Sequence, residues 1–265
     1  MIDTHSHIYL DAFDKDRAEV IAADLADGVA MALLPAIDPT HNDKLFEICN
    51  AYPERFVPMM GLHPTSVNDN PNFREELAQV GSMAKNPPVG ICAIGEAGLD
   101  LYWSRGFIRE QIEALEFQIE LSLELNLPIC IHCREAWGET VKVFERYKGR
   151  GVRGVLHAYS GSYETLRQLQ RYGEFIIGVG GVVTYGGSGY IYMVSKLSPD
   201  EILLESDAPY LTPAPHRGRR NRSGYIRFVC AKLAEIYNLS PSEIEERTTH
   251  NAIDFFRLQG HLKIF

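Results

Sequence analysis

The chain of 265 residues is 45% hydrophobic and 23% charged, which is ordinary for a globular protein with a large buried core. Its net charge of -9, from 26 Lys and Arg against 35 Asp and Glu, argues against a protein that coats nucleic acid with a broad basic surface. We expect no secretory signal and no membrane partner, because the chain has neither a basic and apolar leader nor an apolar run of about 20 residues.

Short apolar segments alternate with amphipathic helical patterns along the whole chain. The predicted strands span residues 1–8, 29–36, 56–62, 90–95, 128–132, 154–157, 175–179 and 202–205. The predicted helices span residues 14–26, 42–51, 72–84, 107–124, 136–147, 163–172, 190–196, 223–237 and 241–257. Strands that alternate with helices form a parallel sheet, and eight such units in about 250 residues are the size of a TIM barrel.

We therefore predict an α/β fold with a single (β/α)8 TIM barrel. One domain over residues 1–265 is expected, because no linker or composition break divides the chain. A doubly wound open sheet is the competing arrangement. It finds little support, since the glycines of residues 178–189 form neither a dinucleotide-binding turn nor a P-loop.

The five cysteines lie mostly in apolar, strand-like or helix-like contexts. An odd number in such contexts favours reduced thiols, and we predict a cytoplasmic protein. Cys130 and Cys133 form a Cys-x-x-Cys pair, but residues three apart on a strand face opposite sides. Both are therefore assigned to packing.

Two histidines, His5 and His7, lie one residue apart in the first predicted strand. Side chains two apart in a strand point to the same face, so both rings would project toward one point, where a metal ion is the expected occupant. Asp3 would lie on that face one step deeper and support a ligand rather than be one.

Other polar side chains come at the ends of the later predicted strands. They are His63, Glu96, His132, His157 and Asp207. The carboxyl ends of parallel strands converge at one mouth of a barrel, which is where sites are found in this fold. We therefore expect a metal site at this mouth, built from His5, His7, Glu96, His132, His157 and Asp207.

Four imidazoles and two carboxylates suit Mg²⁺, Mn²⁺ or Zn²⁺ rather than copper or an iron–sulfur cluster. Six side chains exceed the needs of one tetrahedral ion, and a carboxylate such as Glu96 can bridge. Two divalent ions are thus the predicted cofactors, Mg²⁺ or Mn²⁺ before Zn²⁺, and two-metal centres favour hydrolysis. Residues 216–222 add a locally basic stretch whose guanidinium groups would suit a phosphate.

Taken together, these motifs resemble the TatD family of metal-dependent hydrolases, within the amidohydrolase-like barrels. The matching stretches, in family order, are DTHSH (3–7), GLHP (61–64), GEAGLD (95–100), IHCR (131–134), HAYSG (157–161), ESDAPYL (205–211) and TP through RGRRN (212–221). Three departures stand out: Ala97 replaces a branched aliphatic residue, residues 222–224 replace an acidic residue and a proline, and the loop 185–189 is richer in glycine.

The resemblance implies that His5, His7, Glu96 and Asp207 hold one ion, while Glu96, His132 and His157 hold the second. It also implies hydrolysis of phosphodiester bonds in DNA, commonly as a 3′ to 5′ exonuclease on single strands. Asp207 would accept a proton from the attacking water, so Asp207 and Glu96 are the expected catalytic residues.

For substrate binding, we expect His63 and Arg134 to contact phosphate, since they lie at neighbouring strand ends. Arg217, Arg219 and Arg220 would contact the nucleic-acid backbone further out. DNA is the expected partner, and the sequence leaves the oligomeric state open, with a monomer as one option.

Two other functions stay open at this point. An amidohydrolase or lactonase acting on a small molecule would use the same barrel and ligands. Many such enzymes bridge two metals with a carboxylated lysine, whereas here the fourth strand offers Glu96 and strands four to six contain no lysine. A non-catalytic metal-dependent binding protein would hold metal without turnover.

Overall fold

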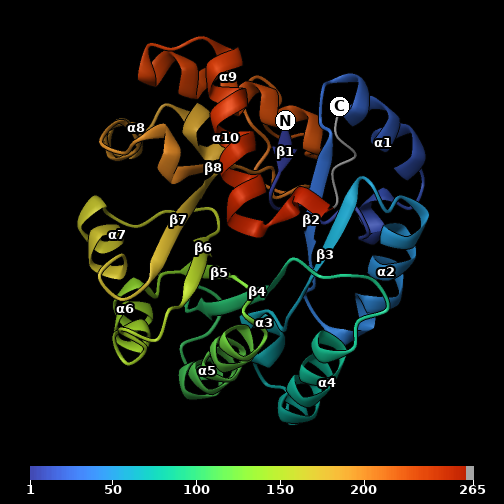
Figure 1. The fold of residues 1–265 in the computed structure, drawn as a ribbon, viewed down its shortest axis with the longest axis vertical. Coiled ribbons are helices and arrows are strands. Elements are labelled where there is room, and N and C mark those ends of the chain that lie inside the picture. Colours follow the sequence, from blue (N-terminus) through green and yellow to red (C-terminus); the bar gives the residue numbers. More distant parts are fainter. Residues whose placement is uncertain (261–265) are drawn as a thin grey trace. The chain divides into compact units, whose positions relative to one another are not determined.

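The computed structural model describes residues 1–260, in which strands and helices alternate along the chain (Figure 1). The strands are β1 (Ile2–Asp3), β2 (Met31–Pro35), β3 (Phe56–Met60), β4 (Ala93–Asp100), β5 (Ile129–Arg134), β6 (Arg153–Leu156), β7 (Glu174–Val179) and β8 (Ile202–Leu204). They follow one another in chain order through the sheet, from β1 to β8. This order and the helices between the strands confirm the predicted (β/α)8 fold class.

The helices match the predicted amphipathic segments closely. They are α1 (Arg17–Ala26), α2 (Asn42–Ala51), α3 (Pro64–Val67), α4 (Phe73–Lys85), α5 (Ile108–Leu125), α6 (Trp137–Glu145), α7 (Tyr163–Leu169), α8 (Ser188–Ser195), α9 (Ile226–Tyr237) and α10 (Pro241–Phe256). Only α3, a single short turn after β3, has no counterpart in the predicted elements. The glycine-rich loop is short, because α8 begins at Ser188, directly after Gly187.

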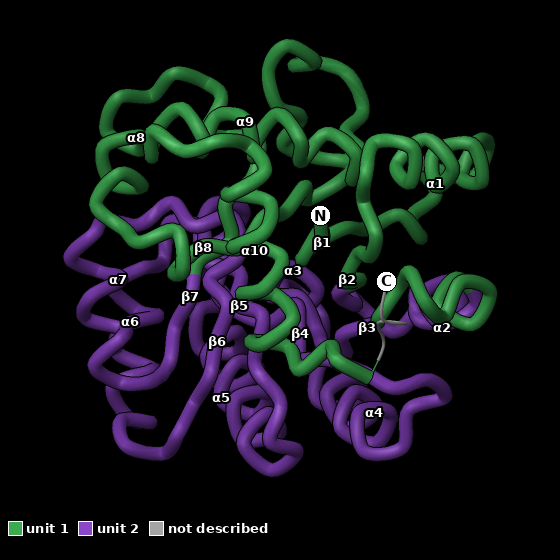
Figure 2. Tube along the Cα trace, turned by 45° about the horizontal axis from the view of Figure 1, so that its top comes forward, with its two compact units in different colours: residues 1–34, 48–57, 177–265 green, residues 35–47, 58–176 purple. Residues whose placement is uncertain are grey.

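The chain divides into two compact units (Figure 2). Unit 1 comprises Met1–Leu34, Ile48–Val57 and the chain from Ile177 onward, and unit 2 comprises Pro35–Glu47 and Pro58–Ile176. The single domain over residues 1–265 stays a prediction, and its last part, residues 261–265, lies outside the described residues.

Unit 2 is built on parallel pairs among β3, β4, β5 and β6. Helix α5 packs on β4 and beside α4. Its buried residues recur at helical spacing, at 111, 114, 115, 118, 119, 121 and 122, so one stripe faces the sheet. Two glutamines on this stripe form hydrogen bonds with the backbone. The side-chain amide of Gln118 accepts from the N–H of Leu62 and donates to its carbonyl oxygen, and Gln111 forms the same two hydrogen bonds with Asp100. Helix α5 thereby fixes the chain after β3 and at the end of β4.

Unit 1 contains the parallel pairs of β1 with β2 and of β7 with β8. The backbone N–H of Thr4 donates to the Leu204 carbonyl oxygen, which places β1 next to β8. The two segments that follow these strands also run parallel, since Ser6 forms an isolated parallel bridge with Ala208. Helix α10 packs against both β8 and α9. The segments that follow β1 and β8 are therefore neighbours.

Three predicted strand ends were wrong. Strand β1 ends at Asp3 instead of residue 8, so His5 and His7 lie beyond it. Strand β4 continues to Asp100, which puts Glu96 inside the strand rather than at its end. Strand β5 likewise continues past His132. The reason is that strand length depends on pairing: Gly98 lies opposite His132 and extends the β4–β5 ladder.

Gly98 makes this close pairing sterically feasible. Its φ is +154°, and a Cβ at this position would overlap the carbonyl oxygen of His132. We expect Gly98→Ala to lower the free energy of unfolding by about 3 kcal/mol, because strand β5 cannot retreat from a packed interior. Urea titration followed by circular dichroism measures this. Gly138→Ala is the matched control, since a Cβ there meets no atom within 4 Å and the position lies in α6. Equal stability of the two variants would contradict the steric account.

The departure at residues 222–224 has a structural explanation within unit 1. Arg222 forms ion pairs with Asp24 and Asp27, and the backbone N–H of Gly224 donates to Asp24 Oδ1 at 2.8 Å. A side chain at Gly224 would collide with the Arg222 guanidinium. These contacts attach the start of α9 to α1 without the proline expected there.

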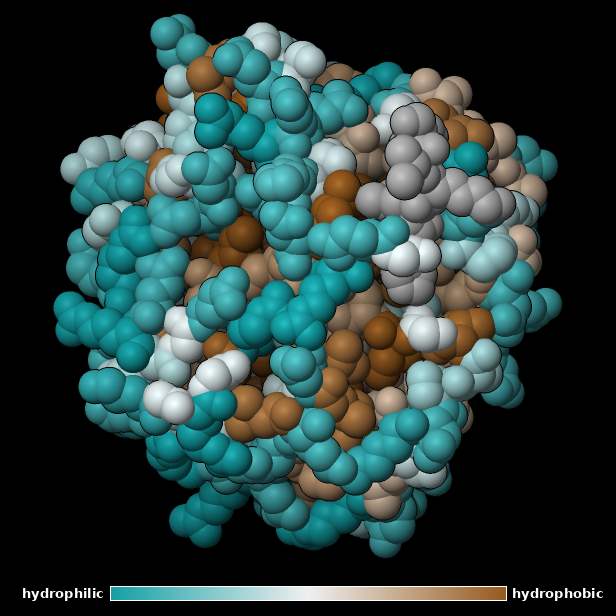
Figure 3. All heavy atoms as spheres, in the orientation of Figure 1, coloured by the Kyte–Doolittle hydropathy of each residue, from teal (hydrophilic) through white to brown (hydrophobic). Residues whose placement is uncertain are grey.

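No helix within residues 1–260 is long and apolar enough to cross a membrane. Hydrophilic residues cover most of the face drawn in Figure 3, and hydrophobic residues show between them. All five cysteines are buried, including Cys130 and Cys133, which were predicted to pack in the interior. Burial raises the pKa of the Cys49 and Cys133 thiols to about 12, which makes these thiols unreactive.

Candidate metal centre

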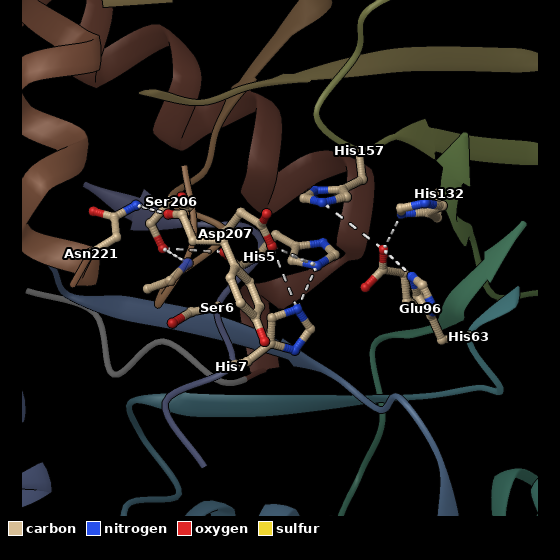
Figure 4. Close-up of polar contacts among 12 residues, drawn as sticks. His5, Ser6, His7, His63, Glu96, His132, His157, Ser206, Asp207 and Asn221 are labelled. Carbon is tan, nitrogen blue, oxygen red and sulfur yellow. Dashed lines mark hydrogen bonds and ion pairs between the residues drawn. The ribbon is translucent and has the colours of Figure 1, made fainter. Parts of the chain in front are cut away.

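In unit 1, His5, His7 and Asp207 converge on one point (Figure 4). The two Nε2 atoms of His5 and His7 lie 3.2 Å apart. Asp207 Oδ1 lies 3.9 Å from His5 Nε2 and 3.6 Å from His7 Nε2. Two ligands of one divalent ion with bonds of about 2.1 Å are separated by roughly 3 Å, so the spacing of these nitrogens fits a metal ion. The same-face orientation predicted for the two histidines is thus present although β1 ends before them.

A contact on the far side of the His7 ring favours the tautomer that a metal ion would need. Its Nδ1 lies 3.2 Å from the hydroxyl of Tyr9, which is fully buried. When Nδ1 carries the proton and donates to that hydroxyl, Nε2 keeps its lone pair. The Tyr9 hydroxyl can therefore select the metal-binding tautomer of His7.

Asp3 supports both ligand-bearing segments through their backbone. It is fully buried and accepts hydrogen bonds from the Ser206 N–H at 2.8 Å, the Ser206 hydroxyl at 2.6 Å and the His5 N–H at 3.2 Å. Burial raises the pKa of Asp3 to about 7, although the hydrogen bonds with Ser206 oppose that rise. Asp3 is thus a supporting residue, as its position in the sequence predicted.

Asp207 occupies a left-handed backbone conformation, with φ +56°. Its N–H donates to the His5 carbonyl oxygen at 2.9 Å, and its own carbonyl accepts from Tyr210 at 2.7 Å. The side-chain amide of Asn221 donates to the carbonyls of Ser206 and Tyr210, at 2.7 and 2.6 Å. Sequence reasoning gave Asn221 no role, yet it holds the turn that aims the Asp207 carboxylate.

In unit 2, three histidine rings point toward one oxygen of Glu96 (Figure 4). Glu96 Oε1 lies 2.9 Å from His132 Nδ1, 3.5 Å from His63 Nε2 and 4.0 Å from His157 Nε2. Donor atoms of His63, Glu96 and His132 all lie within 4.8 Å of one another, which suits a shared cation. The predicted meeting of Glu96, His132 and His157 is present within this unit.

His132 contacts a second carboxylate, which the sequence did not single out. Its Nε2 lies 2.9 Å from Oδ2 of Asp100, the buried last residue of β4. Burial alone would lower the pKa of His132, but Asp100 and Glu96 outweigh it and raise that pKa. The pKa of Asp100 is lowered: burial would raise it, and the contact with His132 overcomes this. The only sequence signal was the position of Asp100 in the GEAGLD motif.

The tautomer of His63 follows from its neighbour Thr65. The backbone N–H of Thr65 donates to His63 Nδ1 at 3.2 Å, so Nδ1 is an acceptor. In the neutral ring Nε2 then carries the proton and faces the site as a donor. This geometry suits contact with a phosphate oxygen, the role predicted for His63, better than metal ligation.

The basic loop of unit 1 has internal partners. Arg217 lies over the Tyr185 ring, 4.0 Å from its centroid, and Arg220 forms an ion pair of 2.5 Å with Asp16. Arg217, Arg219 and Arg220 are all exposed. Their contact with substrate stays a prediction. Arg220 would have to leave Asp16 to reach a phosphate.

Arg134 lies at the end of β5 in unit 2. Its guanidinium carbon is 3.6 Å from the centroid of the Tyr102 ring, and the residue is exposed. Arg134 is therefore a strand-end residue, as predicted, while its contact with phosphate stays a prediction.

Comparison with known proteins gives a consistent family. Residues 2–257 match the family described as TatD related DNase. The chain is 33% identical over 259 residues to YabD, an uncharacterized metal-dependent hydrolase of Bacillus subtilis, covering 97% of this chain and 99% of YabD. It is 26% identical to the 3′-5′ ssDNA/RNA exonuclease TatD of Pectobacterium atrosepticum, covering 97% of this chain and 100% of that protein.

A solved structure agrees with these sequence matches. The crystal structure of YjjV, a TatD homolog from Escherichia coli K12, superposes with a TM-score of 0.88 at 26% identity. The match covers 97% of this chain and 98% of YjjV. The similarity therefore extends over the elements that carry the candidate site residues of both units.

Proposed function

Because the chain belongs to the TatD-related DNase family of metal-dependent hydrolases, we propose that it is a deoxyribonuclease acting from the 3′ ends of single-stranded DNA. The observation that carries the proposal is the convergence of imidazole and carboxylate donors in each unit. The Pectobacterium relative, named as a 3′-5′ ssDNA/RNA exonuclease, supports nucleic acid as the substrate.

We assign His5, His7, Glu96 and Asp207 to one divalent ion and Glu96, His132 and His157 to a second, with Mg²⁺ or Mn²⁺ preferred over Zn²⁺. This assignment rests on the family and on the convergence of strand ends in a barrel. Bound divalent ions would make water more acidic and stabilise charge on the phosphoryl oxygens. The donor types and spacings in each unit fit such ions.

The protein's own residues then have distinct tasks. Asp207, whose side chain is 15% exposed, accepts the proton of the attacking water. His63 donates its Nε2 proton to a phosphate oxygen, and Arg134 supplies a positive charge beside it. We place the enzyme in the cytoplasm because all five of its cysteines are buried and odd in number, and a monomer would suffice for this chemistry.

Cleavage of end-labelled single-stranded DNA, titrated with Mg²⁺, Mn²⁺ and Zn²⁺, tests the proposal. We expect shortening of the labelled strand that needs a divalent ion and stops with EDTA. Labels at either end report the polarity, and RNA of the same sequence reports the sugar preference. Absence of cleavage with every ion counts against a nuclease. Turnover of a lactone or amide alone would assign the protein to small-molecule hydrolysis, and metal binding without turnover would indicate a binding protein.

Asp100→Asn tests how His132 is oriented. The Asn amide would turn its NH2 group toward His132 Nε2, because backbone N–H groups of Tyr102 and Trp103 occupy the other side-chain oxygen. The ring proton would then move to Nδ1 and remove the lone pair that faces Glu96. We expect metal affinity to fall by about 10- to 100-fold, measured by calorimetry with Mn²⁺.

The exposed Asp69, in the same unit, supplies the matched control Asp69→Asn. Nitrogen NMR of labelled histidine reports the His132 tautomer directly in both variants. An unchanged tautomer and affinity in Asp100→Asn would show that Asp100 only packs against the ring.

A further inference from the structure

An exposed aromatic pair lies at the carboxyl ends of β4 and β5. Trp103 is 68% exposed and Tyr102 is 49% exposed, and their ring centroids lie 5.0 Å apart. Trp103 is the most exposed large hydrophobic residue within residues 1–260. An indole ring normally buries most of its apolar surface, and exposing that surface to water is unfavourable.

The backbone of this pair is held by the site itself. The N–H groups of Tyr102 and Trp103 donate to Asp100 Oδ1 at 3.0 and 3.3 Å, while Asp100 Oδ2 contacts His132. The Leu101 N–H donates to the Arg134 carbonyl oxygen at 2.9 Å. The aromatic pair is therefore positioned relative to a proposed metal ligand rather than placed on a free loop.

Arg134 adds a positive charge to this surface. Its guanidinium lies 3.6 Å from the centroid of Tyr102 and 5.8 Å from that of Trp103. The Tyr102 ring is thereby covered by a cation, whereas the Trp103 ring remains the more exposed of the two. A flat apolar face beside a guanidinium matches one nucleotide unit, in which a planar base is linked to a phosphate.

We propose that Tyr102, Trp103 and Arg134 form a stacking platform for an unpaired nucleobase of the substrate, with Trp103 as the stacking surface. This inference rests on the proposed nuclease function and deepens it. A base inside a duplex has both faces covered by its neighbours, so it cannot lie flat on Trp103. A platform for an unpaired base would thus favour single strands over the interior of a duplex, and the tolerance of stacking for every base would make cleavage independent of sequence.

Tryptophan fluorescence tests the platform without any turnover. The chain has two tryptophans: Trp103 packs against Tyr102, whereas Trp137 packs against Tyr159 at a centroid distance of 4.7 Å. In Trp137→Phe, Trp103 is the only fluorophore, and in the matched variant Trp103→Phe it is Trp137. The ligand is a ten-residue oligothymidylate with phosphorothioate linkages, in EDTA and again with Mg²⁺.

We expect saturable quenching in Trp137→Phe and none in Trp103→Phe, with circular dichroism confirming that both variants are folded. Unquenched Trp103 overturns the proposal, whether or not anisotropy of a labelled oligonucleotide reports binding. Equal quenching of both variants also overturns it, because the signal would then come from elsewhere.

Kinetics separate this proposal from the proposed function. We expect Trp103→Ala to raise KM for oligothymidylate roughly tenfold, the size of one lost base stack, with kcat little changed. An oligonucleotide with abasic residues at its 3′ end should be cleaved equally by wild type and Trp103→Ala. Equal KM values on oligothymidylate overturn the platform while leaving the nuclease intact. A wild type without any nuclease activity overturns the proposed function, and the fluorescence result still decides the platform.

Discussion

Asp207→Asn is expected to reduce cleavage of single-stranded DNA by at least about 10³-fold, because one change removes a proposed metal ligand and the proposed proton acceptor together. The backbone contacts of Asp207 with His5 and Tyr210 do not involve the carboxylate, so the turn should persist. Rates on end-labelled single strands at saturating Mn²⁺ measure the effect. Thermal unfolding in EDTA should be close to that of wild type.

The exposed Asp254, in the same unit, is the matched control for Asp207. Its carboxylate forms a surface pair with His250, so Asp254→Asn removes the same charge without touching the site. We expect this control to keep full activity. If Asp207→Asn retained activity within tenfold of wild type, another group would have to accept the proton.

Glu96→Gln is expected to have a comparable effect by a different route. Three imidazole nitrogens face Glu96 Oε1 in unit 2, and a neutral amide cannot balance the charge of a cation there. We expect the variant to bind at least one metal ion fewer per chain and to lose cleavage by about 10³-fold or more. Metal content after gel filtration and the DNA assay measure the two losses separately.

Glu124→Gln supplies the control for that experiment. Glu124 is exposed and pairs with Lys85 at 2.7 Å on the surface of the same unit, so both metal content and activity should stay unchanged. A Glu96→Gln protein with normal metal content but no activity would show that Glu96 acts on the substrate rather than on the ions. Full activity would remove Glu96 from the catalytic residues.

Local periodicity was sufficient to predict the secondary structure. Helix α2 has the predicted bounds of 42–51, and most other helices and strands begin or end within a few residues of the prediction. The spacing of apolar residues indicates which face of a helix or strand is buried, and this spacing can be read from a short stretch of sequence. The parallel order of the strands followed from the alternation alone.

Residue chemistry also indicated which polar side chains lie near one another within each unit. His5 and His7 meet Asp207 in unit 1, and His132 and His157 face Glu96 in unit 2. Strand order explains this result, because residues after adjacent parallel strands are neighbours wherever they lie in the chain. Ligation by these residues stays a prediction.

Sequence by itself thus determined the fold class, the family and which polar side chains come together within each unit. The tertiary structure alone decided how those side chains are held: Asp3 binds Ser206 and Asn221 fixes the Asp207 turn, while Asp100 orients His132. It also decided that Trp103 remains exposed beside the site. The physical reason is the separation of the interacting residues along the chain. Hydrophobic periodicity depends on neighbouring residues, whereas the hydrogen bond between Asp3 and Ser206 joins positions 203 residues apart and forms only when the chain has folded.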